Sequence, residues 1–231
     1  MGQAISDYAS GRPCRRLIVS SPMFDDDEMP VAHLFRTEQA MSALERRALQ
    51  LCRGRVLDVG AGAGCHSLVL QQRGFDVTAL ERSALSADTM RQRGIRQVVT
   101  GDIFTQPFSA KFDTLLLLMN GLGLCGTLQR LPVLLRRLAS LLAPGGQIVT
   151  DACDLRPVFT DDDGTFHAED FDGYYGEVTY TMRYGALRSA PFSWLYVDEA
   201  TLAAVARSSG LTMDVALRGD QADYLAVLGA R

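Results

Sequence analysis

The stretch Arg55-Val-Leu-Asp-Val-Gly-Ala-Gly-Ala-Gly64 decides the fold of this 231-residue chain. Val56–Val59 predict a short buried strand, and the glycines that follow allow a sharp turn with room for a ligand. Residues 65–70 then begin a helix, whose first N–H groups have no partner within the helix and face that ligand. Gly-rich turns of this kind bind nucleotides at the carboxyl edge of a doubly wound sheet.

The side chain of Asp58 indicates which nucleotide the turn takes. A dinucleotide fingerprint would have Gly at the position of Cys65 and usually an apolar residue at the position of Asp58. A carboxylate there disfavours a pyrophosphate, because two anions would crowd one helix end. It favours a ligand that carries a positively charged amine. The alternative is a Rossmann-like domain for another nucleotide.

Four further blocks follow the glycine turn, and with it they resemble the class I S-adenosylmethionine (SAM)-dependent methyltransferases. One Gly-rich turn alone is a weak signal, whereas five blocks in family order, within residues 50–152, are a specific one. The blocks are Val56-Leu-Asp-Val-Gly-Ala-Gly-Ala-Gly64, Glu81 after Val77-Thr-Ala-Leu80, Gly101-Asp-Ile-Phe104, Phe112-Asp-Thr-Leu-Leu-Leu-Leu-Met-Asn120 and Leu142-Ala-Pro-Gly-Gly-Gln-Ile-Val149.

Strand and helix patterns alternate between residues 51 and 152, which indicates a parallel sheet with right-handed crossovers. Beyond that part, residues 176–184 and 190–197 alternate well enough to form an antiparallel hairpin. Near the N-terminus, Thr37 can cap a helix whose apolar positions are three and four residues apart. The acidic run Asp25–Glu28 predicts a solvated loop.

The resemblance implies an α/β fold with a Rossmann-like doubly wound sheet, of order 3-2-1-4-5-7-6 with strand 7 antiparallel, to which the hairpin is added. We expect a single methyltransferase domain over residues 1–231. It would comprise an N-terminal helical lead-in (1–50), the SAM-binding core (51–152), an inserted loop and hairpin that is a candidate lid (153–197), and a closing helix with antiparallel strands (198–231).

Composition narrows the possible partners and compartments. The net charge of −4 gives no global positive field, so no nucleic acid is expected. The five cysteines form no close pair and the three histidines have no metal-ligand spacing, so we expect a reducing cytoplasm and no metal. The N-terminus lacks a signal-peptide run, and the longest apolar run, Leu115–Met119, is too short for a bilayer, so no membrane partner is expected. The oligomeric state stays open.

SAM has an adenine, a ribose, a sulfonium and a methionine end, and the resemblance implies a place for each. Glu81 would accept both ribose hydroxyls, and Asp102 with Ile103 would hold the adenine. The glycine turn would lie against the methionine end, with Asp58 near its amine. The alternatives are that Glu81 is a surface residue and that Asp102 only caps a turn. The implied cofactor-binding set is Asp58, Gly60, Ala61, Gly62, Glu81, Arg82, Asp102, Ile103, Met119 and Asn120.

The methyl group of a sulfonium is already activated, so the enzyme mainly has to hold a nucleophile in line with it. No catalytic dyad is therefore required, and the catalytic residues stay open, with Asn120 and Asp151 as candidates. Asn120 is followed by Gly121-Leu-Gly123, which departs from the Asn-Pro-Pro-Tyr motif of many enzymes that methylate amides or exocyclic base amines. Those substrates are disfavoured. Asn120 could contact the cofactor, orient the substrate or cap the turn.

Four residues outside the five blocks are candidates for the acceptor site. Arg36 could pair with a substrate carboxylate or be a surface charge. Tyr175, Trp194 and Tyr196 offer aromatic rings, which suit a small, partly apolar acceptor, or form the core of the added sheet. We expect methyl transfer from SAM to a small-molecule acceptor, with S-adenosylhomocysteine (SAH) as the product. The rivals are a SAM-binding regulatory module without turnover and an RNA- or protein-modifying methyltransferase.

Overall fold

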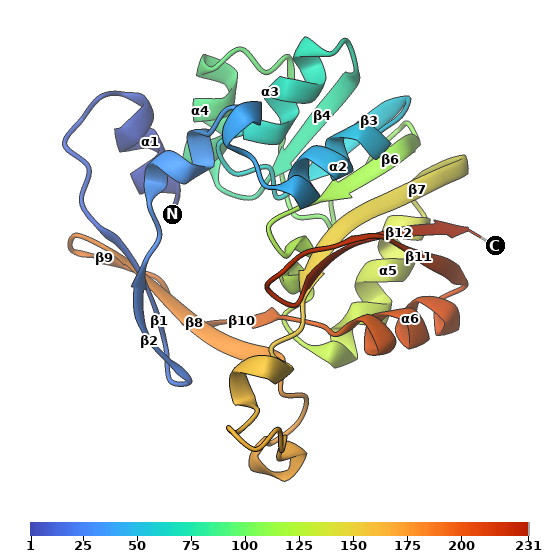
Figure 1. Cartoon of the computed structure of the whole chain (residues 1–231). Coiled ribbons are helices and arrows are strands. Elements are labelled where there is room, and N and C mark those ends of the chain that lie inside the picture. The colour runs from blue at the N-terminus through green and yellow to red at the C-terminus, as the bar shows by residue number, and fades with distance from the viewer. Residues whose placement is uncertain (231) are drawn as a thin grey trace.

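The computed structural model describes residues 1–230, in which a large and a small β-sheet lie side by side (Figure 1). The strands of the large sheet are β3 (Arg55–Val59), β4 (Asp76–Glu81), β5 (Gln97–Thr100), β6 (Phe112–Leu117), β7 (Leu142–Cys153), β11 (Leu211–Arg218) and β12 (Asp223–Ala230). Their order across the sheet is β11-β12-β7-β6-β3-β4-β5. The strands from β3 to β7 are parallel to their neighbours, whereas β12 is antiparallel to both β7 and β11.

This arrangement confirms the predicted sheet. Numbered along the core, the strands have the order 3-2-1-4-5-7-6, and the seventh strand is antiparallel. The central strands are apolar on both faces. Leu57 and Leu115 are buried in one hydrophobic cluster, while Val56 and Leu116 are buried in another. A parallel sheet that helices cover on both sides requires such strands.

Helices cover both faces of the large sheet. On one face lie α2 (Ala43–Leu51), α3 (Cys65–Gln72) and α4 (Ala84–Gln92), and on the other lie α5 (Leu131–Ala139) and α6 (Glu199–Ser208). Helix α5 shows most clearly why these helices pack on the sheet. Its leucines three and four residues apart form a fully buried stripe: Leu131, Leu134, Leu135 and Leu138. In the described part of the chain, no helix has both the length and the apolar character needed to cross a membrane.

The small sheet joins the predicted hairpin to the N-terminal part of the chain. Its strands are β1 (Leu17–Ser21), β2 (Phe24–Glu28), β8 (Glu177–Tyr184), β9 (Leu187–Arg188) and β10 (Phe192–Leu195). Their order is β10-β8-β1-β2, with β9 also paired to β8. The predicted hairpin is confirmed, since β8 and β10 pair antiparallel. The description of residues 1–50 as a helical lead-in is wrong for residues 17–28, which form two of these strands.

The prediction of a solvated loop at Asp25–Glu28 is also wrong. This run lies in β2, which pairs with β1 in the register Ile18 to Glu28 and Val19 to Asp27. All four acidic side chains are exposed, so the run lacks the apolar alternation that would indicate a strand. Charged side chains on such a free edge hinder pairing with a further chain. The sequence also did not indicate helix α1 (Gly2–Ala9), which packs against α4.

The predicted cap at Thr37 is wrong, because helix α2 begins after Ser42. The Oγ of Ser42 accepts the N–H of Glu45 at 3.2 Å, and Oε2 of Glu45 accepts the N–H of Ser42 at 2.8 Å. This reciprocal capping box satisfies two N–H groups at once. Short 3-10 helices complete the fold: η1 (Val31–Phe35), η2 (Glu38–Ala40), η3 (Gly121–Cys125), η4 (Leu128–Arg130), η5 (Arg156–Phe159) and η6 (Ala168–Asp170).

Candidate cofactor and acceptor site

The glycine turn between β3 and α3 is open on one side. Gly60, Gly62 and Gly64 have positive φ angles of 73°, 59° and 80°. A Cβ added at Gly60 or Gly62 would have no neighbouring heavy atom closer than 3.5 Å, whereas a Cβ at Gly64 would lie 2.2 Å from Cδ1 of Ile95. Two of the glycines therefore leave room for a ligand, and the third lets α3 pack closely.

Glu81 ends strand β4 and bonds directly to the glycine turn. Its Oε2 accepts the N–H of Gly62 at 2.9 Å, and its Oε1 accepts the N–H of Ser83 at 2.8 Å. Burial raises the pKa of Glu81, and the two backbone hydrogen bonds oppose that rise. Each carboxylate oxygen has a further lone pair, so both could also accept the adjacent hydroxyls of a ribose. The role at the ribose stays a prediction.

Asp58 lies at the carboxyl end of β3 and is only 2% exposed. Its Oδ2 accepts the hydroxyl of Ser67 at 2.6 Å. Burial raises the pKa of Asp58, and the nearby positive charge of His66 opposes the rise. A ligand amine beside this carboxylate would favour its charged form in the same way.

Asp102 and Ile103 follow strand β5. The Oδ1 of Asp102 accepts the N–H of Phe104 at 2.9 Å, and its carbonyl accepts the N–H of Gln106 at 2.7 Å. Asp102 thus caps a turn, which is the alternative to the predicted role at the adenine. Ile103 is 5% exposed and belongs to the main hydrophobic cluster. Contacts of either residue with an adenine stay predictions.

The chain that follows β6 has an unusual backbone and links the two sheets. Met119 and Asn120 have positive φ angles of 61° and 55°. Asp151 on β7 accepts both of their N–H groups, from Met119 on Oδ2 at 3.1 Å and from Asn120 on Oδ1 at 2.8 Å. The Nδ2 of Asn120 donates to the carbonyl of Leu195 on β10 at 2.8 Å. Its Oδ1 is buried and has no partner within the described residues.

Arg36 belongs to a buried charge cluster. Its guanidinium donates to Oε1 of Glu45 through Nε at 3.0 Å and also through Nη2, and Nε2 of His66 lies 2.7 Å from the same oxygen. Arg36 is 8% exposed, so its interpretation as a surface charge is wrong. Because Glu45 already pairs with this guanidinium, the structure gives no support to a role for Arg36 in binding a substrate carboxylate.

The charges of this cluster stabilise one another. Burial lowers the pKa of His66, but hydrogen bonds to Cys65 and Glu45 outweigh it and raise the pKa to about 10. Burial raises the pKa of Glu45, but hydrogen bonds from His66, Arg36 and the N–H of Ser42 bring it well below its usual range. Glu45 is not among the site residues that the sequence predicts. The spacing Ser42-x-x-Glu45 would have indicated its capping role, but no local pattern indicates its partners.

The three aromatic candidates have different surroundings. Tyr175 is 7% exposed and packs in the cluster that joins the inserted loop to the small sheet, so it belongs to the core. Tyr196 is half-buried, and its hydroxyl lies 3.0 Å from that of Tyr180. Trp194 is half-buried, and its ring lies against Gly123 of η3. Of the three, Trp194 therefore contacts the segment that follows β6.

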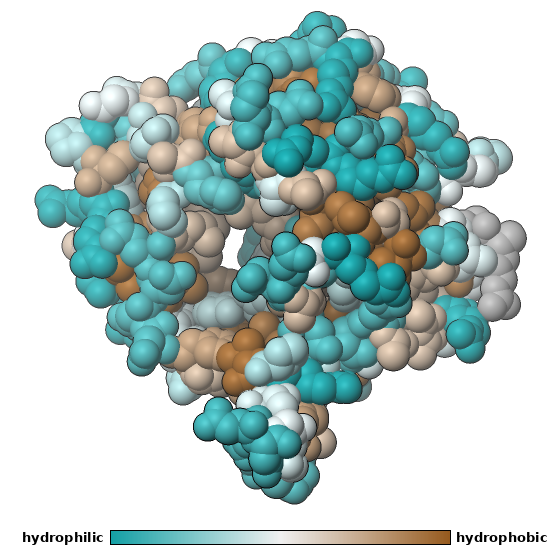
Figure 2. All heavy atoms as spheres, in the orientation of Figure 1, coloured by the Kyte–Doolittle hydropathy of each residue, from teal (hydrophilic) through white to brown (hydrophobic). Residues whose placement is uncertain are grey.

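The candidate cofactor residues gather at one edge of the large sheet, where the parallel strands β3 to β6 end. Arg82 follows Glu81 there and is exposed. The space-filling view shows a hollow near the centre of the molecule, between the N-terminal elements and the large sheet (Figure 2). An open glycine turn, a carboxylate bonded to it and a second, buried carboxylate fit a ligand with a ribose and an amine. The described residues contain no group of three or more side chains that could hold a metal ion.

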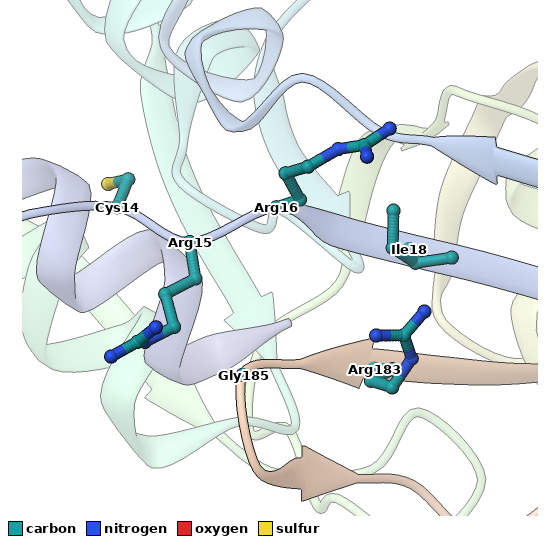
Figure 3. A pocket seen from close by; sticks show the side chains of 6 residues that line it. All are labelled: Cys14, Arg15, Arg16, Ile18, Arg183 and Gly185. Atoms are coloured by element: carbon teal, nitrogen blue, oxygen red, sulfur yellow. The ribbon is translucent and has the colours of Figure 1, made fainter.

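A separate hollow of 390 Å³ lies on the small sheet, and three arginines line it (Figure 3). Figure 3 shows the guanidinium groups of Arg16 and Arg183 on either side of Ile18. Arg16 also pairs with Glu28. None of the candidate cofactor or acceptor residues lines this hollow, so it is not part of the site described above. Its lining is Cys14, Arg15, Arg16, Ile18, Arg183 and Gly185.

Comparisons with known proteins give consistent results. The model of a family described as methyltransferase domain matches residues 32–214. A SAM-dependent methyltransferase from Bacteroides fragilis, whose crystal structure contains SAH, is 43% identical, with a TM-score of 0.93 over 100% of this chain and 94% of that chain.

Two curated proteins match at lower identity. A cypemycin N-terminal methyltransferase from a Streptomyces species is 31% identical over 102 residues, and a protein-L-isoaspartate O-methyltransferase from Aromatoleum aromaticum is 26% identical over 160 residues. The first match covers 43% of this chain and 42% of that protein, and the second covers 63% and 68%. The aligned part of this chain therefore spans less than half the length of the cypemycin enzyme.

Proposed function

The chain belongs to the methyltransferase domain family, within the class I SAM-dependent methyltransferases, and on that premise we propose that its acceptor is a small molecule. The observation that carries this proposal is the contact between the small sheet and the segment after β6, on the side where we expect the acceptor. Asn120 bonds to Leu195 on β10, and the ring of Trp194 lies against Gly123 in the segment after β6. An acceptor between the two sheets would be enclosed, which suits a small molecule better than a large surface.

The residues at the sheet edge have distinct tasks in this proposal. Bound SAM supplies a methyl group on a positively charged sulfur, which makes it open to in-line attack. Glu81 accepts the ribose hydroxyls, and the open side of Gly60 and Gly62 receives the methionine end. The carboxylate of Asp58 favours the amine. Trp194 and the chain after β6 exclude water and hold the acceptor in line, which can contribute about 7–11 kcal/mol to lowering the barrier.

A peptide amine is the second candidate acceptor. It is favoured by the match to the cypemycin enzyme, which is named an N-terminal methyltransferase. The net charge of −4 favours neither this candidate nor an RNA acceptor. A regulatory module that binds SAM without turnover would need the same cofactor residues, so only turnover separates it from an enzyme.

The deciding experiment measures SAH release from SAM with three panels of acceptors: small metabolites, peptides with a free N-terminus, and transfer RNA. Turnover with a metabolite supports the proposal, and turnover only with peptides or RNA overturns it. Calorimetric titration with SAM, SAH and NAD is run beside it. Tight NAD binding without a SAM signal would contradict the cofactor assignment itself.

A further inference from the structure

The backbone of Met119 and Asn120 is strained. Both residues lie in the left-handed region, with φ angles of 61° and 55°. That conformation is unfavourable for an L-residue, and Asn tolerates it better than Met does. Met119 is also 37% exposed, so burial of its side chain does not hold it there. Such a conformation persists only where surrounding contacts determine it.

Asp151 supplies these contacts. Its two carboxylate oxygens accept the consecutive N–H groups of Met119 and Asn120, at 3.1 Å and 2.8 Å. Consecutive backbone N–H groups form a concavity that binds anions, and here the anion is a side chain of the neighbouring strand. Burial raises the pKa of Asp151 to about 6, while the hydrogen bonds from the N–H groups of Asn120 and Met119 act in the opposite direction. Because each oxygen accepts a backbone N–H group, these contacts favour the charged carboxylate.

The same segment holds strand β10. The side chain of Asn120 donates to the carbonyl of Leu195, the residue after Trp194. The ring of Trp194 in turn rests on Gly123. A continuous path of contacts therefore leads from Asp151 on the large sheet to Trp194 on the small one.

We propose that Asp151 is a positioning residue for methyl transfer, which holds the Met119–Asn120 backbone and thereby places β10 with Trp194 over the acceptor. In this role Asp151 acts through the backbone that it holds, and not by removing a proton from the acceptor. The proposal rests on the proposed function for the location of the acceptor. The coupling between Asp151 and Trp194 does not depend on it and can be measured without an acceptor.

The test uses Asp151→Asn, which keeps the shape of the side chain but places an N–H₂ group against one of the two backbone donors. Trp194 is the only tryptophan, so fluorescence quenching by acrylamide reports its exposure. We expect stronger quenching, and about tenfold faster amide exchange at Met119 and Asn120, as the loss of a hydrogen bond to a charged group implies. With an acceptor from the panels, kcat falls by about tenfold.

A second substitution distinguishes a positioning role of Asp151 from a direct role in the chemical step. Glycine adopts positive φ angles freely, so adding Met119→Gly to Asp151→Asn restores wild-type quenching and most of kcat. Asp113→Asn is the matched control: Asp113 accepts the N–H of Arg55 at 2.7 Å at the opposite end of β6, and its loss leaves Trp194 unchanged. Should Asp151→Asn fail to fold, Asn120→Gly keeps the turn but removes the bond to Leu195, and it is expected to expose Trp194 in the same way.

Three results would overturn the proposal: loss of turnover in Asp151→Asn with Trp194 and the amides unchanged, failure of the glycine rescue, or exposure of Trp194 with turnover intact. If the proposed function is wrong, the experiments give a different set of results. In that case the wild-type protein turns over no small molecule, while the fluorescence and exchange measurements still report whether Asp151 controls Trp194.

Discussion

The indole ring of Trp194 occupies the space that a side chain at Gly123 would need. A Cβ at Gly123 would lie 2.1 Å from Nε1 of Trp194 and 2.4 Å from two ring carbons. Gly123 does not have a positive φ angle, so a close approach, not a turn, requires glycine at this position. The small sheet thus rests on the segment after β6 at a contact that tolerates no added atom.

Gly123→Ala is therefore expected to displace Trp194. Overpacking of this kind usually costs about 1–3 kcal/mol of stability. We expect a changed Trp194 fluorescence spectrum, reduced turnover of the acceptor and an unchanged dissociation constant for SAH. Gly229→Ala is the control, because a Cβ there would lie 3.6 Å from Oγ1 of Thr212, an ordinary contact. A wild-type spectrum for Gly123→Ala would mean that β10 is not held against this segment.

Substitutions at two glycines of the turn are expected to differ, one mainly lowering stability and the other mainly lowering SAH affinity. Gly64→Ala combines left-handed strain of about 1–2 kcal/mol with overpacking of about 1–3 kcal/mol against Ile95. Gly62→Ala has only the strain, but its Cβ enters the open side of the turn. Urea unfolding should show the larger loss for Gly64→Ala, and calorimetry the larger loss of SAH affinity for Gly62→Ala. Normal SAH binding by Gly62→Ala would place the ligand elsewhere.

The large sheet could be predicted because its determinants are local and repeated. Each strand end carries a recognisable block, such as the glycine turn after Val59 or Glu81 at the end of β4. The apolar strand Phe112–Leu117 indicates on its own that both faces are covered. The positions of Asp58, the turn and Glu81 at one sheet edge follow directly from this order.

The remainder depends on contacts between distant parts of the chain. Strand β2 is an edge strand with exposed acidic residues, so only its pairing with β1 defines it. The burial of Arg36 depends on Glu45 and His66, which come from two different helices. Asp151 accepts the backbone N–H groups of Met119 and Asn120 and so joins β7 to the segment after β6. No side-chain pattern in the sequence reveals such backbone donors.

Glu81→Gln tests the ribose contact. The substitution removes the negative charge and turns an N–H₂ group toward the N–H of Gly62 or of Ser83. Loss of a hydrogen bond to a charged group costs about 1.5–3 kcal/mol, so SAH affinity should fall by about one to two decades. Asp76→Asn, at the exposed opposite end of β4, should bind SAH normally. An unchanged dissociation constant for Glu81→Gln would move the ribose to another acceptor.

Methyl transfer is expected to need no added metal. The described residues contain no cluster of metal ligands, and in-line displacement from a sulfonium requires no Lewis acid. Activity and SAH binding should therefore persist after exhaustive treatment with a chelator. A loss of activity that Mg²⁺ alone restores would contradict this prediction.

The pH dependence of stability should report the buried cluster of Arg36, Glu45 and His66. The pKa of His66 rises from its usual 6.5 to about 10, because its hydrogen bonds to Cys65 and Glu45 outweigh burial. Folding therefore gains stability from the charged imidazole that is fully present below pH 6.5 and is lost as the pH rises toward 10. The limiting slope is about 1.4 kcal/mol per pH unit.

Urea unfolding between pH 6.5 and 7.5 measures this effect in a window below the titration of cysteines and tyrosines, since a free thiol has a pKa of about 8.5. The free energy of unfolding of the wild-type protein should fall by about 1 kcal/mol across the window, as a single linked proton requires. His66→Gln should be less stable throughout and should lose most of this slope, because Glu45 then lacks its titrating partner. His33→Gln, which changes an exposed histidine, should keep the slope. The exposed His167 also pairs with Glu169, so the decisive quantity is the difference in slope between His66→Gln and His33→Gln. Equal slopes in the two variants would show that His66 is not charged in the folded protein.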